Sequence, residues 1–309
     1  MEHHGKRLDV VLALLFPDYS RSQLSNWLKE GSIKLNEQLA RPKDKVLGGE
    51  RVEVNVQFTP QIEQSKPENI PLNIVYEDDE LIVLNKPANL VVHPGAGNRE
   101  HTLLNALLHH APQLEQLPRA GIVHRLDKDT TGLLVIAKTL KTQTKLVRQM
   151  QEKDVQREYI TLVQGHLISG GEIDTFYGRH SRNRLKMAVL KQGREALTLY
   201  SIRKQYYDFT LLDVQLMTGR THQIRVHMSH INHPVVGDPL YGGRMRFPKD
   251  ASVDFRTKLI DFKRQALHAA RLSFSHPVSE EYLTFEAPLP QDFAELIGFL
   301  DEHLANTSS

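Results

Sequence analysis

The balance between strands and helices constrains the fold of this chain more than any other feature of its sequence. Runs of apolar residues, many of them β-branched, predict strands at 74–76, 81–84, 133–137, 159–163, 197–202 and 209–216. Apolar residues at helical spacing predict helices at 103–110, 142–152, 220–231 and 291–304. Because the strands outnumber the helices and do not alternate with them regularly, we predict an α+β fold. Its sheet is expected to be mixed and mostly antiparallel, not doubly wound.

The first 58 residues are typical of a separate small module. Two helices are predicted, at 8–15 and 21–30, followed by short strands at 33–35 and 52–56. The next residues are rich in Pro, Gln and Glu and predict a linker. We therefore expect three parts, namely a small α/β module over 5–58, a linker over 59–73 and a larger domain over 74–305.

Positive charge is concentrated in three segments, although the formal net charge of the whole chain is only +2. The net charge is +5 over 119–148, +6 over 179–194 and +5 over 244–271, against −5 over 62–80 and −7 over 277–305. Any one such segment is commonly a solvated face. Three basic segments on one side of a fold would instead form an electrostatic footprint for a phosphate backbone. We expect the segments 179–194 and 244–271 to contact phosphates.

Several classes of site are excluded by composition. The chain has no cysteine, which excludes disulfides, cysteine-ligated zinc, thiolate catalysis and cysteine-bound iron–sulfur clusters. The densest histidine group does not line one face of a helix, so we predict no metal site there; its members are His222, His227, His230 and His233. Phosphate-binding, dinucleotide-binding and zinc-protease motifs are absent.

The sequence shows no recognisable targeting or membrane-spanning segment. The N-terminus shows no signal-peptide cleavage site. No apolar stretch approaches the roughly 20 residues that a membrane helix needs. We therefore expect a soluble, cytoplasmic protein that does not bind a membrane.

The segment 119–132 carries the densest group of chemically useful side chains. It contains two aspartates, His124 and three basic residues, and it ends in a glycine just before the apolar run at 133–137. Charged turn residues beside a rigid strand are where catalytic groups are commonly held. A solvated loop with local hydrogen bonds is the competing interpretation. Two further segments have the same character: 217–225, with Arg220 and Arg225, and 157–159, with a tyrosine at the start of a strand.

The sequence HRLDKDTTG at 124–132 resembles the signature of the pseudouridine synthases that modify large-subunit ribosomal RNA. Supporting motifs stand in the order typical of that family: Asn85-Lys86-Pro87 with His93-Pro94-Gly95, then Arg157-Glu158-Tyr159, then Gly219 to His227. The segments 16–22, 91–97 and 237–243 extend the resemblance over essentially the whole chain. The N-terminal module resembles a small RNA-binding module first recognised in a small-subunit ribosomal protein.

This resemblance implies an isomerase that breaks the N1–C1′ bond of a uridine, turns the uracil and rejoins it through C5, without a cofactor or a metal. It implies that Asp127 is the catalytic aspartate, that Arg225 pairs with it and that Tyr159 stacks on the uracil. Three routes stay open for Asp127, namely attack on C1′, addition to C6 and deprotonation of the sugar. Burial alone would raise the pKa of a catalytic carboxyl, so a fixed cation is needed beside it.

The same resemblance implies a set of RNA contacts. Arg125 is expected to fill the space that an extruded uracil leaves. The other expected RNA-contacting residues are Lys86, His124, Arg157, Arg179, Arg182, Arg184, Arg220 and His222. The expected partner is large-subunit (23S) ribosomal RNA or a pre-ribosomal particle, with several uridines modified in the stem–loop at the subunit interface. Nothing in the sequence demands more than a monomer.

Two other functions compete with this interpretation. A glycoside or nucleoside hydrolase would use Asp127 and Asp129, but such enzymes place two carboxylates roughly 5 to 9.5 Å apart across the bond. An i, i+2 pair in a turn does not indicate that arrangement. A non-catalytic RNA-binding factor for ribosome assembly would need only the basic segments, and it predicts that Asp127→Asn changes nothing measurable.

Overall fold

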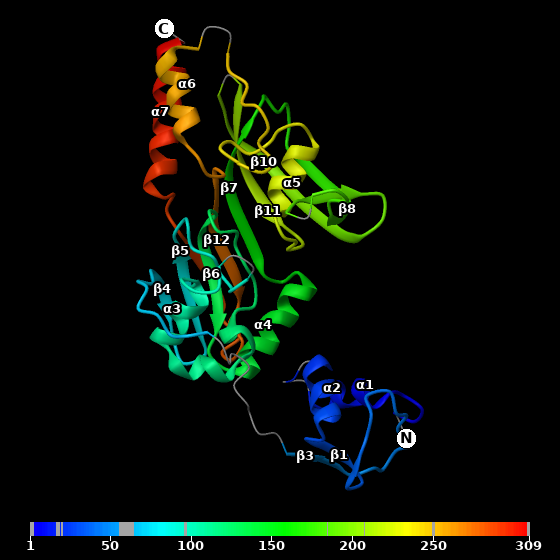
Figure 1. Ribbon diagram of the computed structural model, residues 1–309. Coiled ribbons are helices and arrows are strands. Elements are labelled where there is room, and N and C mark those ends of the chain that lie inside the picture. Colours follow the sequence, from blue (N-terminus) through cyan, green and yellow to red (C-terminus); the bar gives the residue numbers. More distant parts are fainter. Residues whose placement is uncertain are drawn as a thin grey trace.

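The computed structural model (Figure 1) describes residues 3–16, 19, 21–55, 65–95, 98–183, 185–206, 208–248 and 251–307, apart from the side chains of 22, 23 and 304–307. Within these ranges there are two sheets, a small one near the N-terminus and a large one after residue 73. The expected linker is described only from residue 65, and residues 65–73 contain no helix or strand.

The N-terminal module packs two helices against a three-stranded antiparallel sheet. The helices are α1 (Leu8–Leu15) and α2 (Arg21–Glu30), and the strands are β1 (Ile33–Leu35), β2 (Gln38–Leu39) and β3 (Val52–Val54), in the order β2-β1-β3. Asn36 and Glu37 join β1 to β2 with φ values of 49° and 68°, as a tight hairpin turn requires. Leu12 and Leu28 are buried in the core of this module.

The large sheet runs in the order β4-β5-β6-β12-β7-β11-β10-β8-β9, and β13 also pairs with β12. Every described pairing in it is antiparallel except that of β6 with β12, which confirms the predicted mixed, mostly antiparallel sheet. Its strands are β4 (Ile74–Glu77), β5 (Leu81–Lys86), β6 (Thr131–Ala137), β7 (Gln156–Gln164), β8 (Gly171–Arg179), β9 (Met187–Leu190), β10 (Arg194–Tyr206), β11 (Phe209–Leu216), β12 (Leu267–Ser275) and β13 (Tyr282–Glu286).

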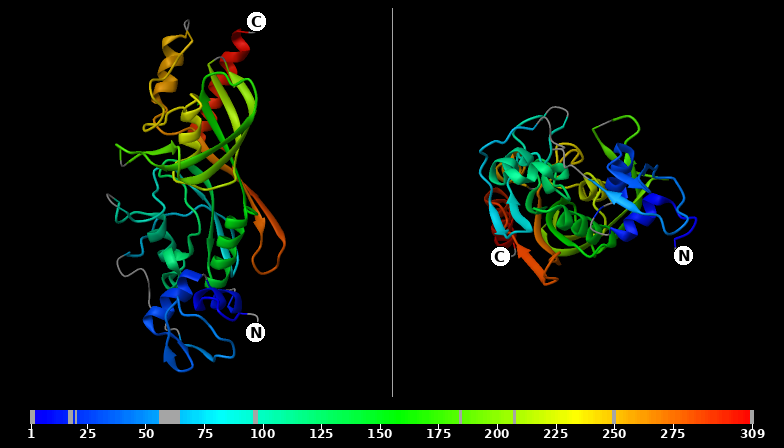
Figure 2. Two further views of the ribbon diagram at one scale, coloured as in Figure 1. Left: turned by 90° about the vertical axis from the view of Figure 1, so that its right-hand side faces the viewer. Right: turned by 90° about the horizontal axis from the view of Figure 1, so that it is seen from below.

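Helices and short turns cover this sheet. They are α3 (Leu103–His110), the 3₁₀ segments η1 (Pro112–Gln116) and η2 (Pro118–Gly121), α4 (Leu140–Glu152), α5 (Gln223–His230), α6 (Val253–Asp261) and α7 (Gln291–Thr307). Figures 1 and 2 show α6 and α7 at the same end of the sheet, where the rings of Phe255 and Phe299 lie 5.8 Å apart. The helix expected over 220–231 begins only at Gln223, because His222 before it has a left-handed backbone with φ 59°.

Several elements were not predicted from the sequence. They are the strands β2, β8, β9, β12 and β13, the helix α6 and the 3₁₀ segments η1 and η2. β8 exposes most of its residues, and β12 contains no Val, Ile or Thr. β12 nevertheless lies in the middle of the sheet because β6, β7 and β13 all pair with it. Its strand conformation therefore comes from its neighbours and not from its own composition.

Strand β6 is buried along its whole length and forms a rigid base for the loop before it. All seven of its residues are buried. Leu134 and Ile136 face one hydrophobic cluster, and Leu133 and Val135 face another on the opposite side of the sheet. Full burial of one such side chain contributes about 1.5–3 kcal/mol. The end of the loop 122–130 is thus fixed by one of the best-packed strands in the described chain.

Much of the predicted charge separation is neutralised by ion pairs. Arg264 binds Asp292 with an Nε–Oδ2 distance of 2.6 Å, and Arg271 binds Glu286. Both arginines belong to the basic segment 244–271, and both acids belong to the acidic segment 277–305. Arg264 is thus largely buried in its pair, whereas the Arg271–Glu286 pair lies on the surface, and a phosphate contact of the segment 244–271 stays a prediction.

Gly132, the second residue of β6, tests the close packing of β6 against β12. It has a φ of 113°, and a Cβ built on it would lie 2.2 Å from the carbonyl oxygen of Ala269 on β12. We expect Gly132→Ala to lower the free energy of unfolding by about 3 kcal/mol, because the parallel β6–β12 pair would have to move apart. Urea denaturation measures this change. Gly298→Ala in α7, where a Cβ meets nothing within 4 Å, should instead stabilise by up to about 1 kcal/mol. An unchanged Gly132→Ala would contradict the close strand approach.

Candidate active site

Asp127 lies on the loop that runs from η2 to β6, and the backbone of this loop is tied down on both sides of the aspartate. The carbonyl oxygen of Asp127 accepts a hydrogen bond from the Thr130 N–H at 3.1 Å. Lys86, at the end of β5, donates from Nζ to the Lys128 carbonyl at 2.9 Å and to the carbonyls of Pro87 and Leu90. The loop is therefore anchored to the neighbouring strand.

Lys86 does not contact RNA, contrary to the prediction. Its side chain is completely buried, and all three of its hydrogen bonds go to backbone carbonyls. Burial lowers the pKa of Lys86 to about 7, even though Asp129 and Asp127 raise it. Its role in the structure is to hold the loop that carries Asp127.

Asp127 is paired with Arg225 from the first turn of α5. The Arg225 Nη1 donates to Asp127 Oδ2 at 2.8 Å. The Asp127 side chain keeps 14% of its surface exposed, whereas Arg225 keeps only 6%. The guanidinium is thus buried behind a carboxylate that still faces solvent.

Asp238 holds Arg225 from its other side. The guanidinium donates to it through Nε–Oδ2 at 2.7 Å and Nη2–Oδ1 at 2.9 Å, and the Asp238 side chain is fully buried. Oδ1 also accepts from the backbone N–H groups of Leu240 and Tyr241. Burial raises the pKa of Asp238, but the bonds and charge of Arg225 outweigh this and leave the pKa below its usual value. Burial likewise lowers the pKa of Arg225, and the two aspartates more than reverse that effect.

His222 and Tyr241 complete the surroundings of the pair. His222 Nε2 lies 3.8 Å from Asp127 Oδ1, and its Nδ1 lies 2.9 Å from the Tyr241 hydroxyl. The Tyr241 ring is 5.2 Å from the Arg225 guanidinium carbon. Burial lowers the pKa of His222, and the charge of Asp127 offsets this only in part. His222 thus lies beside the Asp127 carboxylate with its other ring nitrogen against the Tyr241 hydroxyl.

Tyr159 and Arg157 project from β7 toward the same cleft. Tyr159 is 5% exposed, and burial raises the pKa of its hydroxyl. Arg157 is 8% exposed; its Nη2 donates to the Leu216 carbonyl, and its buried Nε has no hydrogen-bond partner among the described residues. Burial lowers the Arg157 pKa.

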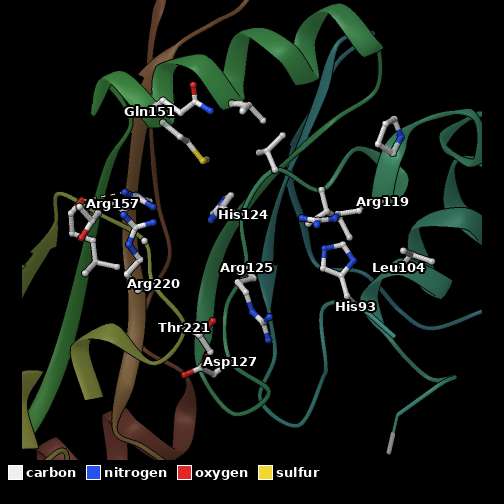
Figure 3. A pocket seen from close by; sticks show the side chains of 18 of the residues that line it. His93, Leu104, Arg119, His124, Arg125, Asp127, Gln151, Arg157, Arg220 and Thr221 are labelled. Carbon is white, nitrogen blue, oxygen red and sulfur yellow. Dashed lines mark hydrogen bonds between the residues drawn. The ribbon is translucent and has the colours of Figure 1, made fainter. Parts of the chain in front are cut away.

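One cleft brings half of the twelve predicted site residues together. Figure 3 shows several of the side chains that line it, and those relevant here are His93, Arg119, His124, Arg125, Asp127, Arg157, Tyr159, Arg220 and Thr221. His124 Nε2 accepts from the Val135 N–H at 3.1 Å, and burial and then the charge of Arg157 lower its pKa to about 3. His124 is therefore an uncharged acceptor and brings no positive charge to RNA.

The remaining predicted contacts lie elsewhere. Arg220 borders the cleft and donates from Nε to the Glu195 carbonyl at 3.1 Å. Arg179, the last residue of β8, and Arg182 are exposed and do not line the cleft. Arg184 lies outside the described residues. Asp129 is not among the described residues that line the cleft, so Asp127 and Asp129 do not flank a common space there.

Two broader findings concern the described part of the chain. It holds no group of three or more His, Cys, Asp or Glu side chains arranged to bind a metal ion. None of its helices is both long enough and apolar enough to cross a membrane.

Comparison with known proteins identifies the two parts of the chain. Residues 80–230 match the RNA pseudouridylate synthase family, and residues 6–52 match the S4 domain. The ribosomal large subunit pseudouridine synthase D of Haemophilus influenzae is 54% identical over 97% of this chain and 92% of its own length. The chain belongs to the RNA pseudouridylate synthase family.

Other members of the family support this assignment. The ribosomal large subunit pseudouridine synthase D of Escherichia coli K12 is 51% identical over 95% of this chain and 90% of its own length. Among solved structures, human RNA pseudouridylate synthase domain containing 4 aligns with a TM-score of 0.57 and 26% identity, over 74% of this chain and 93% of that one. The sequence-based resemblance and the predicted fold are thus confirmed.

Asp238, which holds Arg225, was not predicted from the sequence. It stands in the segment 237–243, which contributed to the resemblance but received no role. The available signal was a lone acid after a glycine that must adopt an unusual backbone. Gly237 has a φ of 72°, and a Cβ there would lie 2.2 Å from the Arg264 carbonyl. That glycine forms the turn which brings Asp238 under α5.

Asp238 should be essential to the stability of the site. We expect Asp238→Asn to lower the free energy of unfolding by about 3 kcal/mol, because it leaves buried Arg225 without its bidentate partner. Asp292→Asn is the matched control, since its carboxylate is half exposed in the pair with Arg264 and should cost less than about 1 kcal/mol. Both changes are measured by urea denaturation. Equal losses for the two variants would show that the buried pair has no special importance.

Proposed function

We propose that this protein isomerises specific uridines of large-subunit (23S) ribosomal RNA to pseudouridine. The observation that carries the proposal is the Asp127 carboxylate, which lines a basic cleft and is held by the buried Arg225–Asp238 pair. The match to the RNA pseudouridylate synthase family and the printed names of the synthase D relatives support the reaction and the RNA class.

The reaction balances without any oxidant, reductant or cofactor. The N1–C1′ bond breaks, the uracil turns, and a C5–C1′ bond forms; C5 gives up its proton, and N1 gains one. We assign the first step to Asp127, in which a carboxylate stabilised by Arg225 attacks C1′, adds to C6 or removes a sugar proton. Each of these three routes starts from the same charged carboxylate, so the ion pair serves all of them.

The target nucleotide must leave its base stack to reach Asp127, which costs on the order of a few kcal/mol. We assign stacking on the uracil to the Tyr159 ring in the cleft. Burial raises the pKa of its hydroxyl, which favours a stacking role over proton removal. Arg125, exposed beside Asp127, is suited to fill the space that the base leaves.

The remaining RNA contacts extend outward from the cleft. Arg157 and Arg220 stand together on one side of it in Figure 3, and we assign them to the flipped nucleotide. We assign phosphates farther along the strand to Arg179 and Arg182. The N-terminal module, which matches the S4 domain, is a second RNA-binding part. The proposed division is the module over 5–58, the linker over 59–73 and the catalytic domain over 74–305.

The biological setting follows from the same proposal. The substrate is large-subunit ribosomal RNA, free or in a pre-ribosomal particle, with several uridines in the stem–loop at the subunit interface. We propose that the enzyme acts as a monomer in the cytoplasm.

A non-catalytic assembly factor remains the second candidate function, because the basic residues alone suffice for RNA binding. The buried charges argue against it. Burying the charges of Arg225 and Asp238 costs free energy unless every one of their hydrogen-bonding groups has a partner. RNA binding alone does not require a buried ion pair behind the Asp127 carboxylate.

The decisive test uses large-subunit ribosomal RNA tritiated at uridine C5. We expect the native protein to release tritium while the uracil stays attached to the RNA, and Asp127→Asn to be slower by ~10³-fold or more. Asp129→Asn is the matched control and should keep most of the activity, since Asp129 does not line the cleft. Equal loss in both variants with free uracil would favour a hydrolase. If neither the native protein nor the two variants release tritium, from free RNA or from pre-ribosomal particles, the assembly factor is favoured.

The stacking role of Tyr159 has a separate test. Binding of a uridine stem–loop is measured in the inactive Asp127→Asn background. Tyr159→Phe keeps the ring, so we expect affinity within about twofold of the parent. Tyr159→Leu removes the aromatic face and should weaken binding by about tenfold, since stacking contributes roughly 1–3 kcal/mol per base. Identical affinities for the Phe and Leu variants would mean that the ring does not stack on RNA.

A further inference from the structure

The turn at residues 119–121 has an unusual backbone. Arg119 and Ala120 adopt left-handed conformations, with φ/ψ of 55°/33° and 51°/41°, and Gly121 follows with a φ of 74°. Side chains with a Cβ are disfavoured in this region, and a run of three such residues is rare. Gly121 has no alternative, because a Cβ there would lie 1.9 Å from the Ala137 carbonyl oxygen.

Packing on both sides holds this turn in place. Leu117 and Ala120 are buried in the large core. The Pro118 carbonyl accepts from Gln143 Nε2 on α4 at 2.8 Å, and Ile122 forms a β-bridge with Ile136. Strain that the surroundings hold in this way is commonly found at functional sites. A glycine at position 119 would suit this backbone better, so the arginine side chain has to contribute something else.

The Arg119 side chain extends into the cleft toward His93, with Arg125 close by (Figure 3). The side chain of neither arginine has a hydrogen bond or an ion pair with any described residue, in contrast to those of Arg225, Arg264 and Arg271. Burial and then the charges of Arg119 and Arg125 lower the pKa of His93 to about 4, and no acid acts on it. Three nitrogen-bearing side chains therefore converge without a matching carboxylate.

We propose that Arg119 and His93, bordered by Arg125, form a subsite for one phosphodiester group of the RNA strand, beside the nucleotide whose base reaches Asp127. Arg119 supplies a planar fork of N–H donors, which matches two phosphate oxygens, and His93 supplies one further ring nitrogen. The left-handed turn sets the direction of the Arg119 side chain before RNA arrives. This subsite rests on the proposed function, because it positions the strand for that reaction.

The first experiment measures the affinity and salt dependence of a uridine stem–loop transcript of large-subunit ribosomal RNA, again with Asp127→Asn as parent. Arg119→Gln should bind about tenfold more weakly, and the slope of log affinity against log salt should fall by about one. The control is Arg203→Gln, which removes an exposed arginine that pairs with Asp213 outside the cleft and should change affinity less than twofold. Equal affinities for both variants would overturn the subsite.

A second variant separates binding from folding. Arg119→Gly removes the side chain but relieves the left-handed backbone, so we expect it to resist urea at least as well as the parent and yet to bind RNA as weakly as Arg119→Gln. A purely structural arginine predicts the opposite result, a less stable variant with unchanged affinity.

The source of the phosphate is settled with neutral methylphosphonate linkages placed one at a time along the stem–loop. At one linkage, the neutral group should weaken binding of the RNA to the parent protein but not to the Arg119→Gln variant. If inorganic phosphate saturates an Arg119-dependent site and no linkage shows this coupling, the subsite binds the free anion and the RNA proposal is wrong.

Tritium release distinguishes failure of the subsite from failure of the proposed function. If the native protein isomerises uridine but Arg119→Gln binds RNA normally, the subsite fails and the proposed function stands. If a linkage couples to Arg119 but the native protein releases no tritium, the subsite stands and the proposed function fails.

Discussion

The buried ion pairs of Arg225 are the interaction on which the rest of the site depends. One guanidinium binds Asp238 through two N–H groups and Asp127 through a third. Charges removed from water destabilise a fold unless each is paired and hydrogen-bonded, and here the backbone N–H groups of Leu240 and Tyr241 complete the bonding of Asp238. The pair therefore forms a rigid, charge-matched support. The Asp127 carboxylate rests against it and still faces the cleft, where it can meet a substrate.

The sheet brings this support together from distant parts of the chain. The loop before β6 carries Asp127, α5 follows β11 and carries Arg225, and the turn after Gly237 carries Asp238. Lys86 at the end of β5 fastens the aspartate loop through the Lys128 carbonyl. The strained turn at 119–121, which leads into the same loop, is held by α4 and β6. The turn and the Asp127 loop thus both depend on the completely buried strand β6.

The sequence predicted those parts whose conformation is decided locally. The helix α3 and the strands β5, β6 and β11 occur where their apolar patterns indicated. The periodic burial of each element depends on residues that are close together in the sequence. β12 was missed, since its strand conformation depends on pairing with β6, β7 and β13 and not on β-branched residues. The prediction for Lys86 was wrong for a related reason. The family resemblance implied an RNA contact for Lys86, and only the packing of β5 against the loop that carries Asp127 buries its side chain.

By itself, the sequence determined the family, the mixed antiparallel fold and the identity of the aspartate and arginine proposed for catalysis, because these follow from residue types in a fixed order. The tertiary structure alone decided which charges are paired and which are free. Arg264 and Arg271 are matched by acids from the C-terminal segment, whereas Arg119 and Arg125 face the cleft without a counter-charge. It also decided that Asp238 supports Arg225. Coulomb energies and hydrogen bonds depend on distance in space, and residues 127, 225 and 238 become neighbours only when the sheet has formed.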